Sequence, residues 1–337
     1  MKCIQLITVL ILASWVFAED KPAYPAFGTI ERLDPRLDKL IPKDAKMEKL
    51  AEGLTWAEGP LWIKDGGFLI CSDVPQNTVF KWKEGDTKLS VFMTPSGYTG
   101  TKPRGGEPGS NGLAIDASGR IIMCEHGDRR ISRVEKDGKK TTLADKYDGK
   151  RFNSPNDVVV RKNGDIYFTD PPYGLVKNWD DPARELDFCG VFRISAKDGA
   201  VSLMTKELVR PNGLAFSPDE KILYVAQSDG EKPIIMAYEV KDDGTLGAGK
   251  VFFDAKPLKK PGKKGAPDGM KVDKDGNLFA TGPGGILIIA PDGTHLGTLD
   301  TGVATANCNW GEDGTVLYIC ADKCIARIKT TTKGNGF

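Results

Sequence analysis

The chain has 337 residues, of which 40% are hydrophobic and 28% are charged, the usual balance for a globular protein with a substantial core. Its 47 Lys and Arg residues are matched by 46 Asp and Glu residues, so there is no basic excess to attract a nucleic acid. One long apolar run occurs, at the start of the chain, and it is too short for a spanning helix. The composition therefore argues against a nucleic-acid-binding protein and against an integral membrane enzyme.

Residues 1–18 have the features of an export signal. Lys2 supplies the positive charge, residues 4–17 form the apolar core, and Val16 and Ala18 are the small residues of a cleavage site. We expect cleavage after Ala18 and export to the periplasm or to the outside of the cell, with no further membrane contact. An uncleaved N-terminal anchor is the alternative. Residues 19–45, rich in Pro and charge, are expected to form an exposed lead-in.

The cysteines do not indicate a disulfide scaffold. Cys3 lies in the expected signal. The other six are Cys71, Cys124, Cys189, Cys308, Cys320 and Cys324. Six cysteines are few for a chain of this length, so we expect buried free thiols. One pairing is left open, that of Cys308 with Cys320 or Cys324.

A pattern of two apolar strands joined by a tight turn recurs six times along the chain. The copies occupy residues 58–73, 111–126, 156–171, 212–228, 268–283 and 306–322. They begin 53, 45, 56, 56 and 38 residues apart, around the length of a four-stranded propeller blade, which is about 40–50 residues. No segment has the period and length of a sizeable helix, which excludes a parallel α/β fold. The repeats predict an all-β, six-bladed β-propeller.

The sixth repeat leaves room for only about three strands before the chain ends. Residues 46–54, just before the first repeat, are expected to supply the missing outer strand of this last blade. Such a closure would make residues 46–337 a single domain.

A polar residue recurs at one position of the repeats, eight residues before the turn. The five copies that carry it have Glu58, Asn111, Asn156, Asn212 and Asp268. In the sixth repeat the position is Ala306, with Asn307 one step away. In a propeller this position is the entry of the innermost strand of each blade, so the side chains should converge at the rim of the central channel.

Carboxylate and carboxamide oxygens are hard ligands that suit Ca²⁺, with Mg²⁺ or Mn²⁺ as alternatives. Glu58 and Asp268 together would balance a divalent charge, and Asn156 and Asn212 would add neutral oxygens. The chain has only two histidines, which excludes a zinc site built from a histidine cluster. These residue types also shape turns, but five aligned copies favour a metal site over turn chemistry alone.

Several long motifs resemble the gluconolactonase branch of the SMP-30/gluconolactonase/luciferin-regenerating-enzyme family, over about residues 45–328. They are AEGPLW (57–62), CEHGDRRISRV (124–134), NSPNDVVV (153–160), IYFTDPPYG (166–174), PNGLAFSPDEK (211–221) and PDGMKVDKDGNLFATGPGG (267–285). The resemblance implies a six-bladed propeller that holds one divalent cation and hydrolyses a sugar lactone. Ca²⁺ is the expected ion, and Zn²⁺, Mn²⁺ and Mg²⁺ remain open.

Carried over to this chain, the resemblance makes Glu58, Asn212 and Asp268 metal ligands. Asn156 is a further ligand or a substrate contact. Two departures from the family pattern concern the substrate rather than the metal. The last repeat reads NCNWGEDGTV (307–316), and Ser154 stands near the place of a substrate-contacting Arg in some eukaryotic members.

We expect Asp268 to be the catalytic base as well as a ligand. Asn111 and Asn156 would orient the substrate. His126 would contact the substrate or shuttle a proton, with a purely structural histidine as the alternative. Asp170 and Tyr173 would line the mouth of the site.

Two other functions fit the same residues. One is hydrolysis of phosphotriesters at the same cation. The other is a non-catalytic propeller stabilised by calcium that binds a sugar or a protein. No feature of the sequence indicates an obligate protein partner.

Overall fold

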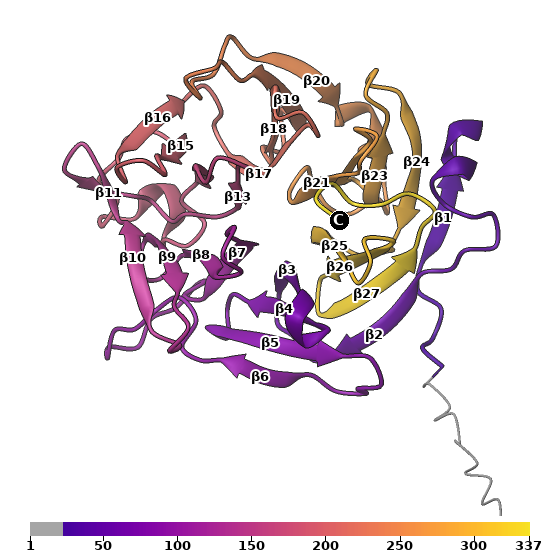
Figure 1. Cartoon of the computed structure of the whole chain (residues 1–337), viewed down its shortest axis with the longest axis horizontal. Coiled ribbons are helices and arrows are strands. Elements are labelled where there is room, and N and C mark those ends of the chain that lie inside the picture. The colour runs from indigo at the N-terminus through magenta and orange to yellow at the C-terminus, as the bar shows by residue number, and fades with distance from the viewer. Residues whose placement is uncertain (1–22) are drawn as a thin grey trace, which may run out of the picture.

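Six antiparallel sheets surround a central axis in the computed structural model, which describes residues 23–337 (Figure 1). In each blade, the first strand of the sequence repeat is the innermost strand of the sheet, and the following strands lie progressively farther from the axis. The expected all-β, six-bladed propeller is therefore confirmed. The expected signal at residues 1–18, with Cys3, lies outside the described residues.

Blades 1 to 3 each contain four strands in chain order. Blade 1 has β3 (Ala57–Ile63), β4 (Phe68–Asp73), β5 (Thr78–Lys83) and β6 (Ser90–Met93). Blade 2 has β7 (Ser110–Ile115), β8 (Ile121–Glu125), β9 (Arg130–Val134) and β10 (Lys140–Ala144). Blade 3 has β13 (Val158–Val160), β14 (Ile166–Asp170), β15 (Gly190–Ile194) and β16 (Val201–Thr205). A small separate hairpin consists of β11 (Lys146–Tyr147) and β12 (Lys150–Arg151).

Blade 4 follows the same order, whereas blades 5 and 6 each gain a strand from the N-terminal segment. Blade 4 has β17 (Pro211–Phe216), β18 (Ile222–Gln227), β19 (Ile234–Glu239) and β20 (Lys250–Asp254). Blade 5 has β21 (Met270–Val272), β22 (Leu278–Gly282), β23 (Gly285–Ile289), β24 (His295–Asp300) and, outermost, β1 (Thr29–Arg32). Blade 6 has β25 (Thr305–Gly311), β26 (Val316–Ala321), β27 (Cys324–Lys329) and, outermost, β2 (Glu48–Glu52).

The helical content consists of short 3-10 turns. They are η1 (Pro35–Lys39), η2 (Lys64–Gly66), η3 (Asn178–Asp180) and η4 (Lys256–Leu258). Within residues 23–337, no helix has the length and apolar character needed to cross a bilayer.

The second strand of each blade is sandwiched between neighbouring blades, and this explains its sequence. All six residues of β26 and all five of β22 are buried, so these strands are continuous apolar runs rather than alternating ones. The outermost strand β6 is largely exposed. The core is therefore divided among the spaces between blades.

Strand β2 closes the ring, as the sequence predicts. It pairs antiparallel with β27, and Glu48 lies opposite Arg327. Arg327 Nε also donates a hydrogen bond of 2.8 Å to Glu48 Oε2. The first and last parts of the propeller are thus joined within one sheet.

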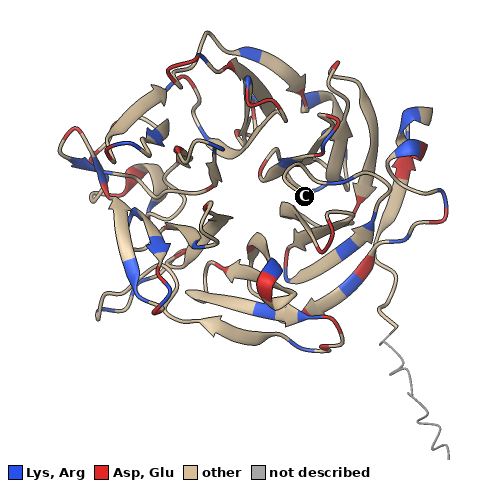
Figure 2. Cartoon of the chain, viewed as in Figure 1, with Lys and Arg blue, Asp and Glu red and all other residues tan. Residues whose placement is uncertain are grey.

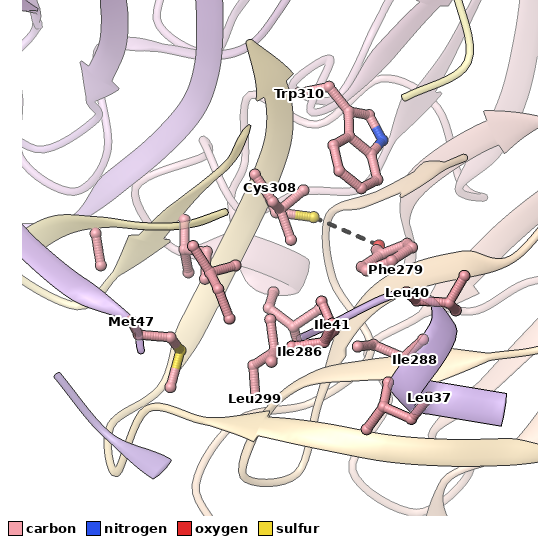
Figure 3. Packing of buried hydrophobic residues seen from close by; sticks show 14 of the residues in the cluster. Leu37, Leu40, Ile41, Met47, Phe279, Ile286, Ile288, Leu299, Cys308 and Trp310 are labelled. Atoms are coloured by element: carbon pink, nitrogen blue, oxygen red, sulfur yellow. Dashed lines mark hydrogen bonds between the residues drawn. The ribbon is translucent and has the colours of Figure 1, made fainter. Parts of the chain in front are cut away.

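The segment before β2 does not match the expectation of an exposed lead-in over residues 19–45. Strand β1 pairs with β24, and η1 begins at Pro35, with Asp34 accepting from the Arg36 backbone N–H as its cap. This turn buries Leu37 completely against blade 5, beside Ile286 and Ile288 (Figure 3). The segment has too few apolar residues to show a recognisable period in the sequence. Its described part nevertheless packs against blade 5.

Replacement of Leu37 by Ala is expected to lower the free energy of unfolding by about 2–5 kcal/mol, because it leaves a cavity in this cluster. Leu33→Ala is the matched control, since Leu33 is 53% exposed and its truncation should cost about 0.5 kcal/mol or less. Denaturant unfolding of both variants measures the difference. Equal stabilities would show that the N-terminal segment does not pack as described.

The six described cysteines are buried free thiols, as expected. Cys308 Sγ lies 3.4 Å from the carbonyl oxygen of Phe279 (Figure 3), and Cys324 Sγ lies 3.2 Å from that of Ala321. Cys320 Sγ approaches the carbonyl oxygen of Glu58 at 3.7 Å. The three thiols thus have different partners, and the pairing left open for Cys308 is not formed.

Charged residues of both signs are interspersed around the blades (Figure 2). Even the lysine-rich segment 256–265 is partly neutralised, because Lys263 Nζ lies 2.5 Å from Asp300 Oδ2. The distribution agrees with the nearly equal numbers of basic and acidic residues.

Candidate metal and substrate site in the channel

The five polar residues of the repeats lie at equivalent places on their blades, at or just before the innermost strand. We call them the ring residues: Glu58 on β3, Asn111 on β7, Asn156 before β13, Asn212 on β17 and Asp268 before β21. The side chains of Glu58, Asn111, Asn156 and Asn212 are buried, and Asp268 is partly exposed. The sequence-predicted ring is thus assembled at one level of the propeller.

Small hydrogen-bond donors of the second strands hold the ring residues from the neighbouring blade. Ser72 Oγ donates to the carbonyl oxygen of Asn111 at 2.8 Å, and Thr169 Oγ1 donates to that of Asn212 at 2.7 Å. Both donors are the penultimate residue of a second strand, as is Cys320, which approaches the carbonyl oxygen of Glu58. A repeated position in the second strands thus holds the backbone carbonyl groups of three ring residues in place.

Glycine follows four of the ring residues and allows the inner strands to approach closely. Gly59 has φ +48°, and a Cβ there would overlap the carbonyl oxygen of Asn111. A Cβ at Gly213 would likewise overlap the carbonyl oxygen of Asp268. These glycines are needed for a narrow ring rather than for turn formation.

The two ring carboxylates share an unfavourable electrostatic environment. Burial raises the pKa of Glu58 to about 8, and the nearby negative charge of Asp157 adds to the shift. Burial also raises the pKa of Asp268 well above its usual range, and the negative charge of Glu58 is the next cause. Two such carboxylates resist being ionised together unless a cation lies near them.

Several buried oxygens at the ring have no hydrogen-bond partner, and this indicates whether a cation would fit there. Within the described residues, Asn212 Oδ1, Asn111 Oδ1 and Asp157 Oδ2 are buried and accept no hydrogen bond. Buried acceptors of this kind are costly, and a hard cation would satisfy that of Asn212, a predicted ligand. The described residues contain no cluster of three or more His, Cys, Asp or Glu side chains suited to a metal. The ring does not depend on one, because it combines two carboxylates with amide oxygens.

A second polar layer lies next to the ring. Asn307 was noted in the sequence only as one step from the ring position, and Asp157 was not singled out. Asp157 and Asn307 occupy the position that is glycine in the other four repeats. Asn307 Nδ2 donates to Glu58 Oε2 at 3.2 Å, and a Cβ at Gly269 would overlap this amide. An alignment of the residue after each ring position would have revealed Asp157 and the link between the two side chains.

Asn307→Ala is expected to weaken cation binding by about 10- to 100-fold, because Glu58 would lose the donor that orients it. Calorimetric titration of cation into the chelated protein measures the dissociation constant. Asn163→Ala, in the β13–β14 turn, is the control and should leave the constant unchanged. An unchanged constant in Asn307→Ala would show that Glu58 needs no support from Asn307.

His126 is completely buried and lies next to the ring. Its Nε2 is 3.5 Å from Asn111 Nδ2, and its Nδ1 is 3.4 Å from Glu107 Oε2. The His126 imidazole therefore contacts one of the ring residues, Asn111. Glu107, which the sequence analysis did not single out, belongs to the irregular connection 94–109 between β6 and β7 and not to a repeated strand position.

Tyr173 reaches the site through Ser228. Its hydroxyl oxygen lies 2.6 Å from Ser228 Oγ, which also accepts from Asn212 Nδ2 at 3.2 Å. Burial raises the pKa of Tyr173 to about 12, and the negative charge of Asp268 adds to the shift. Tyr173 and Ser228 thus fix the amide of Asn212 so that its oxygen remains unpaired.

Asp170, expected at the mouth of the site, has a structural position instead. It is fully buried, and its two carboxylate oxygens accept from the backbone N–H groups of Asn153 and Ser154, at 2.7 and 2.8 Å. Burial raises its pKa to about 7. Asp73, at the end of β4, accepts from the Thr55 N–H in the same way. The carboxylate that ends a second strand therefore braces the loop before the inner strand, and its oxygens are not free for a substrate.

Ser154 also has a local role. Its hydroxyl donates to the carbonyl oxygen of Pro171 at 2.5 Å and accepts from the Gly174 N–H at 2.9 Å. The residue at the place of the family's arginine therefore holds the Pro171–Gly174 loop.

The fold and the site together define a class: six-bladed propellers with a ring of oxygen donors at the entry of the inner strands. The sequence profile of the SMP-30/Gluconolactonase/LRE-like region matches residues 56–323. The chain belongs to this family.

Several named proteins are similar to this chain over most of their length, at 30–41% sequence identity. The gluconolactonase of Zymomonas mobilis is 41% identical over 97% of this chain and 93% of its own length. The pentonolactonase of Haloferax volcanii is 30% identical over 78% of this chain and 80% of its own. The solved structure of a Xanthomonas campestris gluconolactonase has a TM-score of 0.77 at 32% identity, covering 92% of this chain and 99% of that one.

Proposed function

We propose that the protein hydrolyses a sugar lactone with the help of one divalent cation held by Glu58, Asn156, Asn212 and Asp268. Its family and the named activities of its relatives support a lactone hydrolase. The observation that supports the cation is the raised pKa of both ring carboxylates, Glu58 and Asp268, together with the buried, unpaired oxygen of Asn212. Hard oxygen donors of this kind favour Ca²⁺.

The cation and the ring residues would have different roles in the reaction. When bound, the cation would polarise the lactone carbonyl and stabilise the negative charge that develops on its oxygen. Asp268, the partly exposed ring carboxylate, would take a proton from the attacking water and give it to the leaving alkoxide oxygen, which becomes the hydroxyl of the product. Asn111 and Asn156 would hold the hydroxyl groups of the sugar.

The test follows acid release from D-glucono-1,5-lactone with chelated protein and with protein resupplied with Ca²⁺, Mg²⁺, Mn²⁺ or Zn²⁺. Each rate is corrected with the same cation in protein-free buffer, because lactones hydrolyse spontaneously. Turnover that needs a cation supports the proposal, and turnover by the chelated protein at the full rate overturns the role of the cation.

The same preparation separates the two alternatives. Turnover of a phosphotriester but of no lactone would assign the site to the phosphotriesterase reaction. If the protein binds the cation yet turns over neither a panel of lactones nor the phosphotriester, the site is that of a calcium-stabilised binding propeller.

A further inference from the structure

Hydrogen bonds hold the segment 94–109, which joins β6 to β7, at both ends and in the middle. At its far end the Gly109 N–H donates to the carbonyl oxygen of Val74 at 2.8 Å. Asn77 Oδ1 accepts from the backbone N–H groups of residues 96, 97 and 98, at 3.2, 2.8 and 3.0 Å. Farther along, the Arg104 guanidinium donates to the carbonyl oxygen of Gly174 on blade 3. The loop of blade 1 is thus fastened to the loop of blade 3.

Glu107 extends from this segment toward the ring. Its negative charge contributes to the raised pKa values of Glu58 and Asp268, after burial and the charges nearer to them. Its nearest recorded polar contact is His126, whose Nδ1 is 3.4 Å from Glu107 Oε2. Within the described residues, Nδ1 makes no hydrogen bond, and the Glu107 carboxylate at this distance is the acceptor that lies near it.

The other nitrogen of His126 defines which atom carries the proton. Asn111 Nδ2 lies 3.5 Å from His126 Nε2, and an amide NH₂ can only donate. With the Asn111 amide in this orientation, Nε2 is the acceptor, which places the proton of the neutral ring on Nδ1, facing Glu107. A proton on Nε2 would instead require Asn111 to present its oxygen to the imidazole.

We propose that Glu107 and His126 position Asn111. Glu107 selects the tautomer with the proton on Nδ1, His126 Nε2 then accepts from Asn111 Nδ2, and Asn111 Oδ1 is held toward the channel as an acceptor. This oxygen is buried and has no partner among the described residues. In the opposite tautomer the amide would turn over and offer donors to the channel.

For the substrate, this arrangement predicts recognition of a hydroxyl group that donates to Asn111 Oδ1, an inference that rests on the proposed lactone hydrolysis. A site built to pair a hydroxyl rejects an analogue that lacks it, because a buried polar atom is left unpaired. Glu107 and His126 act through Asn111 and are positioning residues.

The chain has only two histidines, which makes the tautomer measurable. His295 lies on β24, with Nε2 3.1 Å from Thr298 Oγ1, so His295→Asn leaves His126 as the single imidazole of an untagged protein. Nitrogen-15 NMR of that imidazole should show the proton on Nδ1. Glu107→Ala should shift the proton toward Nε2, and Glu231→Ala, an exposed glutamate, should not.

Kinetics on the lactone provide the second measurement. Glu107→Ala should raise KM by roughly tenfold, as expected for one lost hydrogen bond, with a smaller change in kcat. Glu107→Gln should restore much of the affinity, because its amide oxygen can still accept from Nδ1. The proposal is wrong if His126 carries its proton on Nε2, or if Glu107→Ala changes neither the tautomer nor KM. The tautomer is read without substrate, so a protein that proves not to be a lactonase would still test the positioning of Asn111.

Discussion

Replacement of Asp268 by Asn is expected to lower kcat/KM for the lactone by about 10³-fold, the range for loss of a general base. The substitution keeps the size of the side chain but removes one of two ring carboxylates. It also removes the repulsion between Asp268 and Glu58 that helps to raise both pKa values. We therefore expect weaker cation binding together with an unfolding temperature no lower than that of the unsubstituted chelated protein. Steady-state kinetics, calorimetric cation titration and thermal unfolding measure the three quantities.

Asp275→Asn is the matched control, because Asp275 lies on the same blade in the exposed β21–β22 turn and, among residues 23–337, its carboxylate forms an ion pair with Lys274 alone. Its kinetics and cation affinity should be unchanged. If Asp268→Asn kept both its activity and its affinity, Asp268 would be neither a ligand nor the base.

Removal of the cation is expected to abolish turnover and to destabilise the fold at neutral and alkaline pH. A ligand present at 1,000 times its dissociation constant stabilises a protein by about 4 kcal/mol. The chelated protein should therefore unfold at a clearly lower temperature than the Ca²⁺-loaded protein. Identical unfolding curves with and without the chelator would mean that the channel binds no Ca²⁺.

The pH dependence of this difference has a defined sign. In the cation-free protein the pKa of Glu58 is raised from its usual 4.5 to about 8. A carboxyl whose pKa is higher in the folded state contributes stability below its unfolded pKa, and this contribution is lost as the pH rises through the folded pKa. The chelated protein should thus become less stable between about pH 4.5 and pH 8. Protons compete with the cation, so stabilisation by Ca²⁺ should increase over the same interval, which unfolding at pH 5 and pH 8.5 would detect.

Symmetry made much of the site predictable from the sequence. Because each blade repeats the same path, a constant offset of eight residues places Glu58, Asn212 and Asp268 at one level. Glu107 could not be found in this way, because it lies in the irregular connection between β6 and β7 and not at a repeated position of a strand. Asp170 was misassigned for the opposite reason. Its position at the end of the second strand recurs as Asp73 in blade 1. At both places the carboxylate holds the loop before the inner strand by hydrogen bonds, so this position supports the loop rather than the chemistry.

The shared sheet of blade 6 has a consequence for how the protein is made. Glu48 and Arg327 are 279 residues apart in the sequence, yet they are paired in adjacent strands. During synthesis, β2 emerges long before β27 and must wait unpaired until nearly the whole chain has been produced. Contacts of such high sequence separation slow folding, because the entropy of closing the loop is lost before the contacts form. We expect a late, rate-limiting joining of the two ends, after blades 1 to 4 have formed from contacts local to each blade.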